Sequence, residues 1–177
     1  MIEREEIVAT LLKAAGGRMV GRVRFQKVAF LLDKLGLNSG FRYNYGNYGP
    51  FSHDLDNAVA DAEAFGLVEE TFDRRQIDGA RYSIFEITDD ASRLPSKADQ
   101  LNETVLERYL QTFVNADVTV LELAATANWL VEEEKLTDWR DELRRRKGPK
   151  VQGGRLDHAL ALLHEVGLPP ANADVRT

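Results

Sequence analysis

Cysteine is absent from this chain of 177 residues. Its absence excludes disulfide bonds, thiolate metal ligands and cysteine nucleophiles, and it suits a reducing compartment, so we expect a cytoplasmic protein. A chain of this length buries roughly 70% of its unfolded surface. It therefore needs neither a disulfide nor a metal to hold a core.

Long hydrophobic runs are also absent. No apolar stretch approaches the roughly 20 residues that span a bilayer. Residues 1–13 carry three glutamates where a signal peptide has a basic start. We therefore expect a soluble chain with no membrane partner.

The sequence lacks the motifs of common catalytic and cofactor sites: it has no P-loop, no GxGxxG, no GxSxG and no HExxH. His158 and His164 are six residues apart, so they point to different sides of a helix. His53 stands between two polar residues at a helix start, where neighbouring side chains diverge instead of forming a triad. We therefore expect no enzymatic activity, no cofactor and no metal. An enzyme that uses scattered carboxylates is the remaining alternative.

Hydrophobic spacing and turn residues predict the order of elements in the first half of the chain. The predicted elements are helices over 3–15, 22–35 and 52–65, a short strand over 41–46 and a hairpin over 67–88. Asp78-Gly79 is the turn signal of the hairpin. Three helices followed by a two-stranded wing is the winged-helix order, in which the short strand pairs with the wing.

We therefore expect an α+β fold that is mostly α, with a winged-helix-like core and C-terminal helices packed on it. The predicted division is a core over residues 1–92, a helical extension over 93–168 and a disordered tail over 169–177. The extension should pack on the core, because no flexible linker separates them. Within it, Thr119 and Glu122 fit a capping box at a helix start.

The charge distribution argues against DNA recognition through the third helix. In a winged helix this helix enters the major groove, but residues 51–66 carry four carboxylates and no lysine or arginine. The basic cluster Arg18, Arg22, Arg24 and Lys27 offers an alternative phosphate contact. The competing interpretation places Arg22, Arg24 and Lys27 on the solvent face of a helix, paired with acids. A second basic cluster, over 140–155, is either a solvated helix end or a site for an acidic partner.

The densest aromatic stretch covers residues 41–51. We expect Phe41 and Phe51 to lie in the core. Tyr43, Tyr45 and Tyr48 fit either the edge of the core or an interface, where tyrosine is a favoured anchor.

Three short motifs together resemble a known family: GRVRFQK at residues 21–27, YGPFS at 48–52 and GLV at 66–68. The combination is similar to the YwgA-like proteins of the Panacea or SocA-like antitoxin-domain group, and the resemblance covers about residues 5–90. Phe25 and Phe51 stand where the family commonly has leucine and tyrosine. Members of the wider group act as antitoxins or adaptors that neutralise a toxin by direct contact, and the resemblance implies no catalysis.

We therefore predict a non-enzymatic protein-binding module, an antitoxin-like or adaptor protein that binds a toxin or another client directly. The predicted partner-binding residues are Tyr43, Tyr45, Tyr48, Arg22, Arg24 and Lys27. A nucleic-acid-binding regulator is the first alternative, although the acidic third helix disfavours it. An enzyme of unrecognised type is the second.

Overall fold

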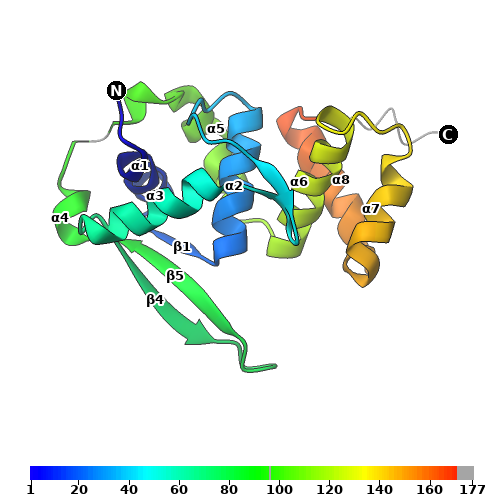
Figure 1. The fold of residues 1–177 in the computed structure, drawn as a ribbon, viewed down its shortest axis with the longest axis horizontal. Helices are drawn as coiled ribbons and strands as arrows, with labels where there is room; N and C mark the ends of the chain where they lie inside the picture. Colours follow the sequence, from blue (N-terminus) through cyan, green and yellow to red (C-terminus); the bar gives the residue numbers. More distant parts are fainter. Residues whose placement is uncertain (96, 171–177) are drawn as a thin grey trace.

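The computed structural model describes residues 1–95 and 97–170 and has an α+β fold that is mostly helical, as predicted (Figure 1). The helices are α1 (Arg4–Ala14), α2 (Arg22–Lys34), α3 (His53–Ala64), α4 (Asp89–Ser92), α5 (Glu103–Val114), α6 (Val118–Glu132), α7 (Trp139–Lys147) and α8 (Arg155–Val166). Two 3-10 helices, η1 (Ala98–Gln100) and η2 (Gly148–Val151), complete the helical elements. Across the described ranges, no helix combines the length and the apolar character that a membrane crossing requires.

The five strands form two small antiparallel sheets. They are β1 (Arg18–Val20), β2 (Asn44–Gly46), β3 (Gly49–Phe51), β4 (Val68–Arg74) and β5 (Arg81–Ile87). The larger sheet has the order β1-β5-β4, and its β4–β5 hairpin projects from the helical body (Figure 1). The hairpin predicted from Asp78-Gly79 is therefore present.

The strand that joins the hairpin is not the predicted one. β1 pairs with β5 and sets Met19 opposite Phe85, both of them buried. Residues 44–46 pair instead with Gly49–Phe51 in a separate two-stranded ribbon. The prediction was wrong because a three-residue strand has no readable periodicity, and its partner is chosen by packing.

The junction between α2 and α3 explains two of the sequence motifs. Ser52 caps α3, since its hydroxyl accepts a hydrogen bond from the Leu55 amide at 3.1 Å. The Gln26 side chain donates to the Ser52 carbonyl at 2.9 Å and accepts from the Ser52 amide at 2.8 Å. Both residues are buried, so these bonds satisfy backbone groups that would otherwise lack partners.

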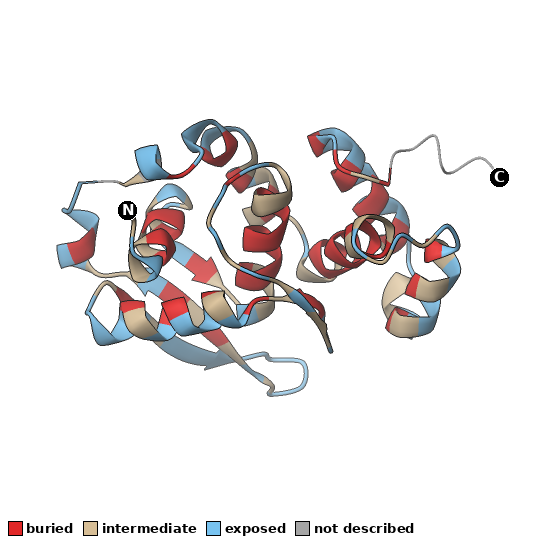
Figure 2. Ribbon diagram, turned by 45° about the horizontal axis from the view of Figure 1, so that its top comes forward, coloured by how far each residue is buried: buried red, intermediate tan, exposed pale blue. Residues whose placement is uncertain are grey.

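Helix α6 is the centre of the C-terminal half. Ten of its fifteen residues are buried (Figure 2), as expected for a helix that is apolar nearly all round. It packs against α2, α7, α8 and β3. The helices after residue 100 and the N-terminal half therefore share one hydrophobic core.

Two details of the extension differ from the predictions. The N-cap of α6 is Asp117, whose carboxylate accepts from the Thr119 and Val120 amides. Thr119 and Glu122 therefore form no capping box, and Glu122 turns into the interior. The predicted tail over 169–177 lies outside the described residues from 171 onward, while the Pro169 carbonyl accepts a hydrogen bond from Asn128.

Candidate functional site

The turn between β2 and β3 presses against α2 and α6 and organises the most unusual side-chain cluster of the chain. Gly49 in this turn has φ +90°, and a Cβ atom there would lie 2.6 Å from Thr126 Oγ1. Glycine supplies both the backbone conformation and the close approach that the turn needs. The glycine of the YGPFS motif is thus explained by backbone geometry.

Behind this turn, three lysines gather around one carboxylate. Lys27 of α2 donates to the Pro50 carbonyl at 2.6 Å. Lys147 and Lys150 both bind Glu122 of α6, with N–O distances of 2.9 to 3.0 Å. The Lys147 and Glu122 side chains are almost fully buried, whereas 41% of the Lys150 side chain is exposed. We call Lys27, Lys147, Lys150 and Glu122 the lysine cluster.

The lysine cluster predicts a pH dependence of stability. Burial lowers the pKa of Lys27 to about 7, with Lys147 and Lys150 adding to the shift and Glu122 opposing it. An unfolded lysine has a pKa of about 10.4, so between about pH 7 and 10 the unfolded chain binds more protons than the folded chain. The free energy of unfolding of the wild type, relative to Lys27→Met, should rise by roughly 1 kcal/mol per pH unit in this window. Below about pH 7 both states hold the proton, and the difference should level off.

Urea denaturation of both proteins at several pH values measures this difference. Both proteins carry the same other groups that titrate in this window, so the contributions of those groups cancel in the difference between the two free energies of unfolding. A difference that stays constant between about pH 7 and 10 would contradict the lowered pKa.

A groove of about 270 Å³ opens between α2, α3 and the β2–β3 turn. Its apolar walls come from Val23, Phe25, Leu55, Val59 and Phe85. Tyr48 and Lys27 line the groove beside the turn. Arg22, at the start of α2, also lines it and is paired with Asp56 and Glu70 at 3.2 and 2.9 Å. We call this the α2–α3 groove.

The structure brings three of the six predicted partner-binding residues into the α2–α3 groove: Arg22, Lys27 and Tyr48. Tyr48 is 57% exposed, and Lys150 Nζ lies 5.2 Å from the centre of its ring. Tyr45 is half-buried and does not line the groove; its ring lies 6.2 Å from that of Trp129, and the Arg146 guanidinium is 4.7 Å from its ring centre. These contacts hold both rings in place.

The other two predicted residues, Tyr43 and Arg24, lie elsewhere. The Tyr43 hydroxyl donates to Asp33 at 2.7 Å, and burial together with this carboxylate raises the pKa of Tyr43 above its usual value. Arg24 donates to the carbonyl of Val114, the last residue of α5, and to the carbonyl of Ala116 in the loop that follows. Both side chains hold neighbouring elements together.

The interpretation of the first basic cluster as a paired solvent face holds only for Arg22. That side chain is exposed and bound to acids, whereas Lys27 is 1% exposed and Arg24 is half-buried. The interpretation was wrong for Lys27 because helical spacing does not reveal that the β2–β3 turn covers this side of α2.

Sequence reasoning missed Glu122, which it assigned to a helix cap. It placed Lys147 and Lys150 in the second basic cluster, either a solvated helix end or a site for an acidic partner, without linking them to Lys27. A signal was present, because Glu122 is a carboxylate between Leu121 and Leu123 in the middle of a mostly apolar helix. A charge in such a place is buried and needs a partner.

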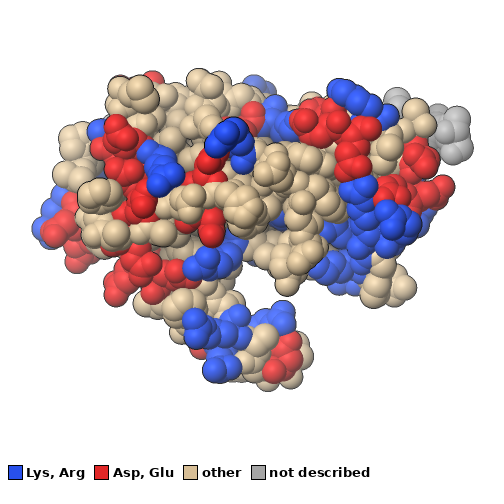
Figure 3. Space-filling model, viewed as in Figure 1, with Lys and Arg blue, Asp and Glu red and all other residues tan. Residues whose placement is uncertain are grey.

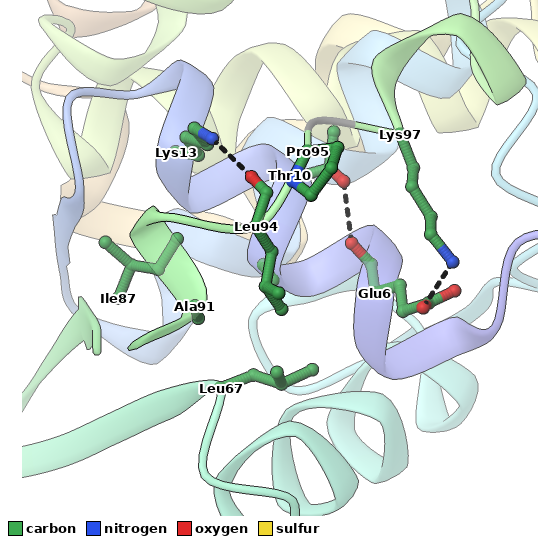
Figure 4. A pocket seen from close by; sticks show the side chains of 10 residues that line it. Glu6, Thr10, Lys13, Leu67, Ile87, Ala91, Leu94, Pro95 and Lys97 are labelled. Atoms are coloured by element: carbon green, nitrogen blue, oxygen red, sulfur yellow. Dashed lines mark hydrogen bonds and ion pairs between the residues drawn. The ribbon is translucent and has the colours of Figure 1, made fainter. Parts of the chain in front are cut away.

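A second cavity, of about 280 Å³, lies between α1, α4 and the base of the hairpin (Figure 4). Its polar groups are already bound to each other. Lys97 lies 2.5 Å from Glu6 and lowers the pKa of that carboxyl, and Lys13 donates to the Leu94 carbonyl at 2.9 Å. Within residues 1–95 and 97–170, no histidine and carboxylate side chains gather into a group that could hold a metal. The α2–α3 groove is therefore the better candidate site.

Comparison with known proteins gives one informative match. No protein-family model matches the chain. A DNA ADP-ribosyl glycohydrolase of Thermus aquaticus is 27% identical over a match of 151 residues, and the match covers 74% of this chain and 37% of that protein. The chain thus spans little more than a third of this relative's length.

This match corrects the expectation that the chain has no enzymatic activity, because the relative is named for an enzyme. The expectation rested on missing motifs, and motifs identify only the chemistries that have short sequence signatures. The match does not bear on the resemblance to the YwgA-like proteins, which stays a prediction.

Proposed function

We propose that this chain is a protein-binding module, antitoxin-like or an adaptor, that holds its partner in the α2–α3 groove. In this proposal the N-terminal half is a winged-helix-like unit related to the YwgA-like proteins. The partner is a toxin or another client protein.

The observation that carries the proposal is Tyr48, an exposed aromatic side chain at the edge of an apolar groove. Protein interfaces concentrate their binding energy in aromatic anchors next to well-formed pockets. The turn that holds Tyr48 is fixed by Gly49 and by the Lys27 bond to Pro50, so little conformational entropy is lost on binding. These features favour a partner-binding surface.

A nucleic-acid partner has less support. Of the basic cluster that would contact phosphates, Lys27 is buried and Arg24 is bound to backbone carbonyls. Helix α3 carries carboxylates and no cation, and phosphates would be repelled there. Protein binding therefore remains the leading proposal.

The test is affinity capture from the native host with matched variants. Val23→Glu places a charge at the edge of the groove, and its position in the first turn of α2 suits the helix dipole. Tyr48→Ala removes the exposed ring. Phe65→Ala is the control, since Phe65 is 69% exposed but lies outside the groove. Circular dichroism verifies that each variant folds.

We expect one stoichiometric protein to be captured by the wild type and by Phe65→Ala, and to be lost or strongly reduced with Val23→Glu and Tyr48→Ala. A partner that both groove variants retain would place the interface elsewhere. Capture of no protein by the wild type would contradict the proposal as a whole.

A second candidate function follows from the match to the Thermus aquaticus protein. We propose that the chain takes part in removing ADP-ribose from DNA, alone or beside another segment or protein. An oligonucleotide that carries ADP-ribose is incubated with the chain, and released ADP-ribose is measured against a heat-denatured control. If neither the chain alone nor the chain with its captured partner releases ADP-ribose, this candidate fails.

A further inference from the structure

We propose that the segment bound in the α2–α3 groove is an acidic peptide of the partner protein, which places an apolar anchor in the groove and a carboxylate at the lysine cluster. This inference rests on the proposed function and adds the chemistry of the ligand.

The first argument is the charge of the lysine cluster. Three lysines face one carboxylate, Glu122, which Lys147 and Lys150 share. Lys27 Nζ has the Pro50 carbonyl as its one hydrogen-bond acceptor among the described residues. Lys150, whose side chain is 41% exposed, is the member of the cluster that a carboxylate from outside can reach, and such a carboxylate would balance the second of the two lysines that share Glu122.

The second argument is an unpartnered hydroxyl in the same place. Thr126 is fully buried, and its Oγ1 has no hydrogen-bond partner among the described residues. The Cβ position of Gly49 lies 2.6 Å from this oxygen and within 3.8 Å of the Lys27 and Lys147 ammonium nitrogens. The unpartnered Thr126 hydroxyl and the ammonium nitrogens of Lys27 and Lys147 thus lie together directly behind the turn that carries Tyr48.

The third argument is that the cationic surface continues beyond the groove. Lysine and arginine side chains gather over α7, next to the β2–β3 ribbon (Figure 3). Arg144 is exposed there, and the nearest carboxylate, Asp141, is 3.8 Å away. A segment that leaves the groove past Tyr48 and Lys150 meets these cations, so further acidic residues would be attracted.

The groove itself favours a peptide over a nucleic acid. Its apolar walls suit an apolar side chain, and Tyr48 is the one exposed large aromatic residue among those that line it. Arg22, at the start of α2, is already neutralised by Asp56 and Glu70, so phosphates would gain no free cation there. An extended polyanion would also meet the carboxylates of α3.

The experiment selects phage-displayed random peptides on the immobilised full chain. Selections run in parallel on the wild type and on Val23→Glu, and the enriched sequences are compared. The best peptide is then synthesised, and its dissociation constant is measured by fluorescence anisotropy. The measurements use the wild type, Lys150→Ala, and the control Arg74→Ala, which removes a cation from the turn end of the hairpin, outside the groove lining.

We expect enriched peptides to combine an apolar residue with two or more aspartates or glutamates, and to be absent from the Val23→Glu selection. Lys150→Ala should weaken binding about fivefold, the upper range for a partly exposed ion pair. Arg74→Ala should change binding less than about twofold. Each aspartate or glutamate of the peptide is replaced in turn by asparagine or glutamine. The replacement of the residue that contacts Lys150 should weaken binding to the wild type and have little further effect on binding to Lys150→Ala.

Other outcomes overturn the inference in distinguishable ways. Peptides that are lost on Val23→Glu but are not acidic, or that bind Lys150→Ala as tightly as the wild type, would refute the acidic ligand. The groove would then remain a protein-binding site. A labelled single-stranded oligonucleotide that binds through Lys150 while no peptide binds would assign the surface to nucleic acid. If no peptide is enriched, the ligand assignment fails, and the capture experiment decides separately whether the groove binds a protein.

Discussion

Replacing Glu122 with glutamine should lower the free energy of unfolding by about 3 to 5 kcal/mol, the usual cost of removing one partner of a buried ion pair. Glu122 is 3% exposed and is the carboxylate bound by both Lys147 and Lys150. Without it, the Lys147 ammonium stays buried with no counterion. Lys150 is partly exposed and can turn to water, so most of the loss comes from Lys147.

Urea denaturation of Glu122→Gln measures this loss of free energy. The control is Glu107→Gln, which makes the same substitution at an exposed position of α5. The double variant Glu122→Met Lys147→Met should recover much of the stability, since buried ion pairs are often replaced by apolar pairs without loss. If Glu122→Gln and Glu107→Gln differ by less than about 1 kcal/mol, the lysine cluster does not depend on this carboxylate.

The second large effect is expected at Gly49. Gly49→Ala should destabilise the fold by about 3 kcal/mol, because a positive φ strains any other residue and the new methyl group overlaps Thr126 Oγ1. The β2–β3 turn would have to move away from α6. The change should therefore also displace Tyr48 and weaken partner binding.

Gly40→Ala separates the two causes. Gly40 has φ +83°, close to the value at Gly49, but no atom lies within 4 Å of its Cβ position. It should lose only about 1 kcal/mol through backbone strain. Thr126→Ala introduced together with Gly49→Ala should relieve the overlap and leave a loss similar to that of Gly40→Ala. Equal losses for Gly49→Ala and Gly40→Ala would mean that the contact with Thr126 is unimportant.

The local elements of this protein were readable from the sequence. Helices α2 and α3, each followed two residues later by a glycine with positive φ (Gly36 and Gly66), and the hairpin around Asp78-Gly79 are set by short-range signals: hydrophobic spacing, a residue that tolerates positive φ, and a turn pair. The Ser52 cap belongs to the same class. Such signals need only neighbouring residues, so one sequence suffices to read them.

The candidate site could be predicted only in part. Tyr48 was one of three tyrosines in the densest aromatic stretch that fitted either the core edge or an interface, and the structure places it at the edge of a groove. Lys27 was grouped with Arg22 and Arg24 as a basic cluster, although these three side chains end in different environments. Spacing along α2 gives their angular positions on the helix, but not which neighbouring element covers each one.

The sequence by itself determined the mostly helical α+β class, the positions of the main helices and the hairpin, and the acidic character of α3. Only the tertiary structure decided that β1 joins the hairpin, that Glu122 faces the interior, and that Lys27, Lys147 and Lys150 meet behind one turn. The reason is physical. Local conformation depends on adjacent residues, whereas the charge balance of the lysine cluster depends on groups up to 123 positions apart (Lys27 to Lys150), which only packing brings together.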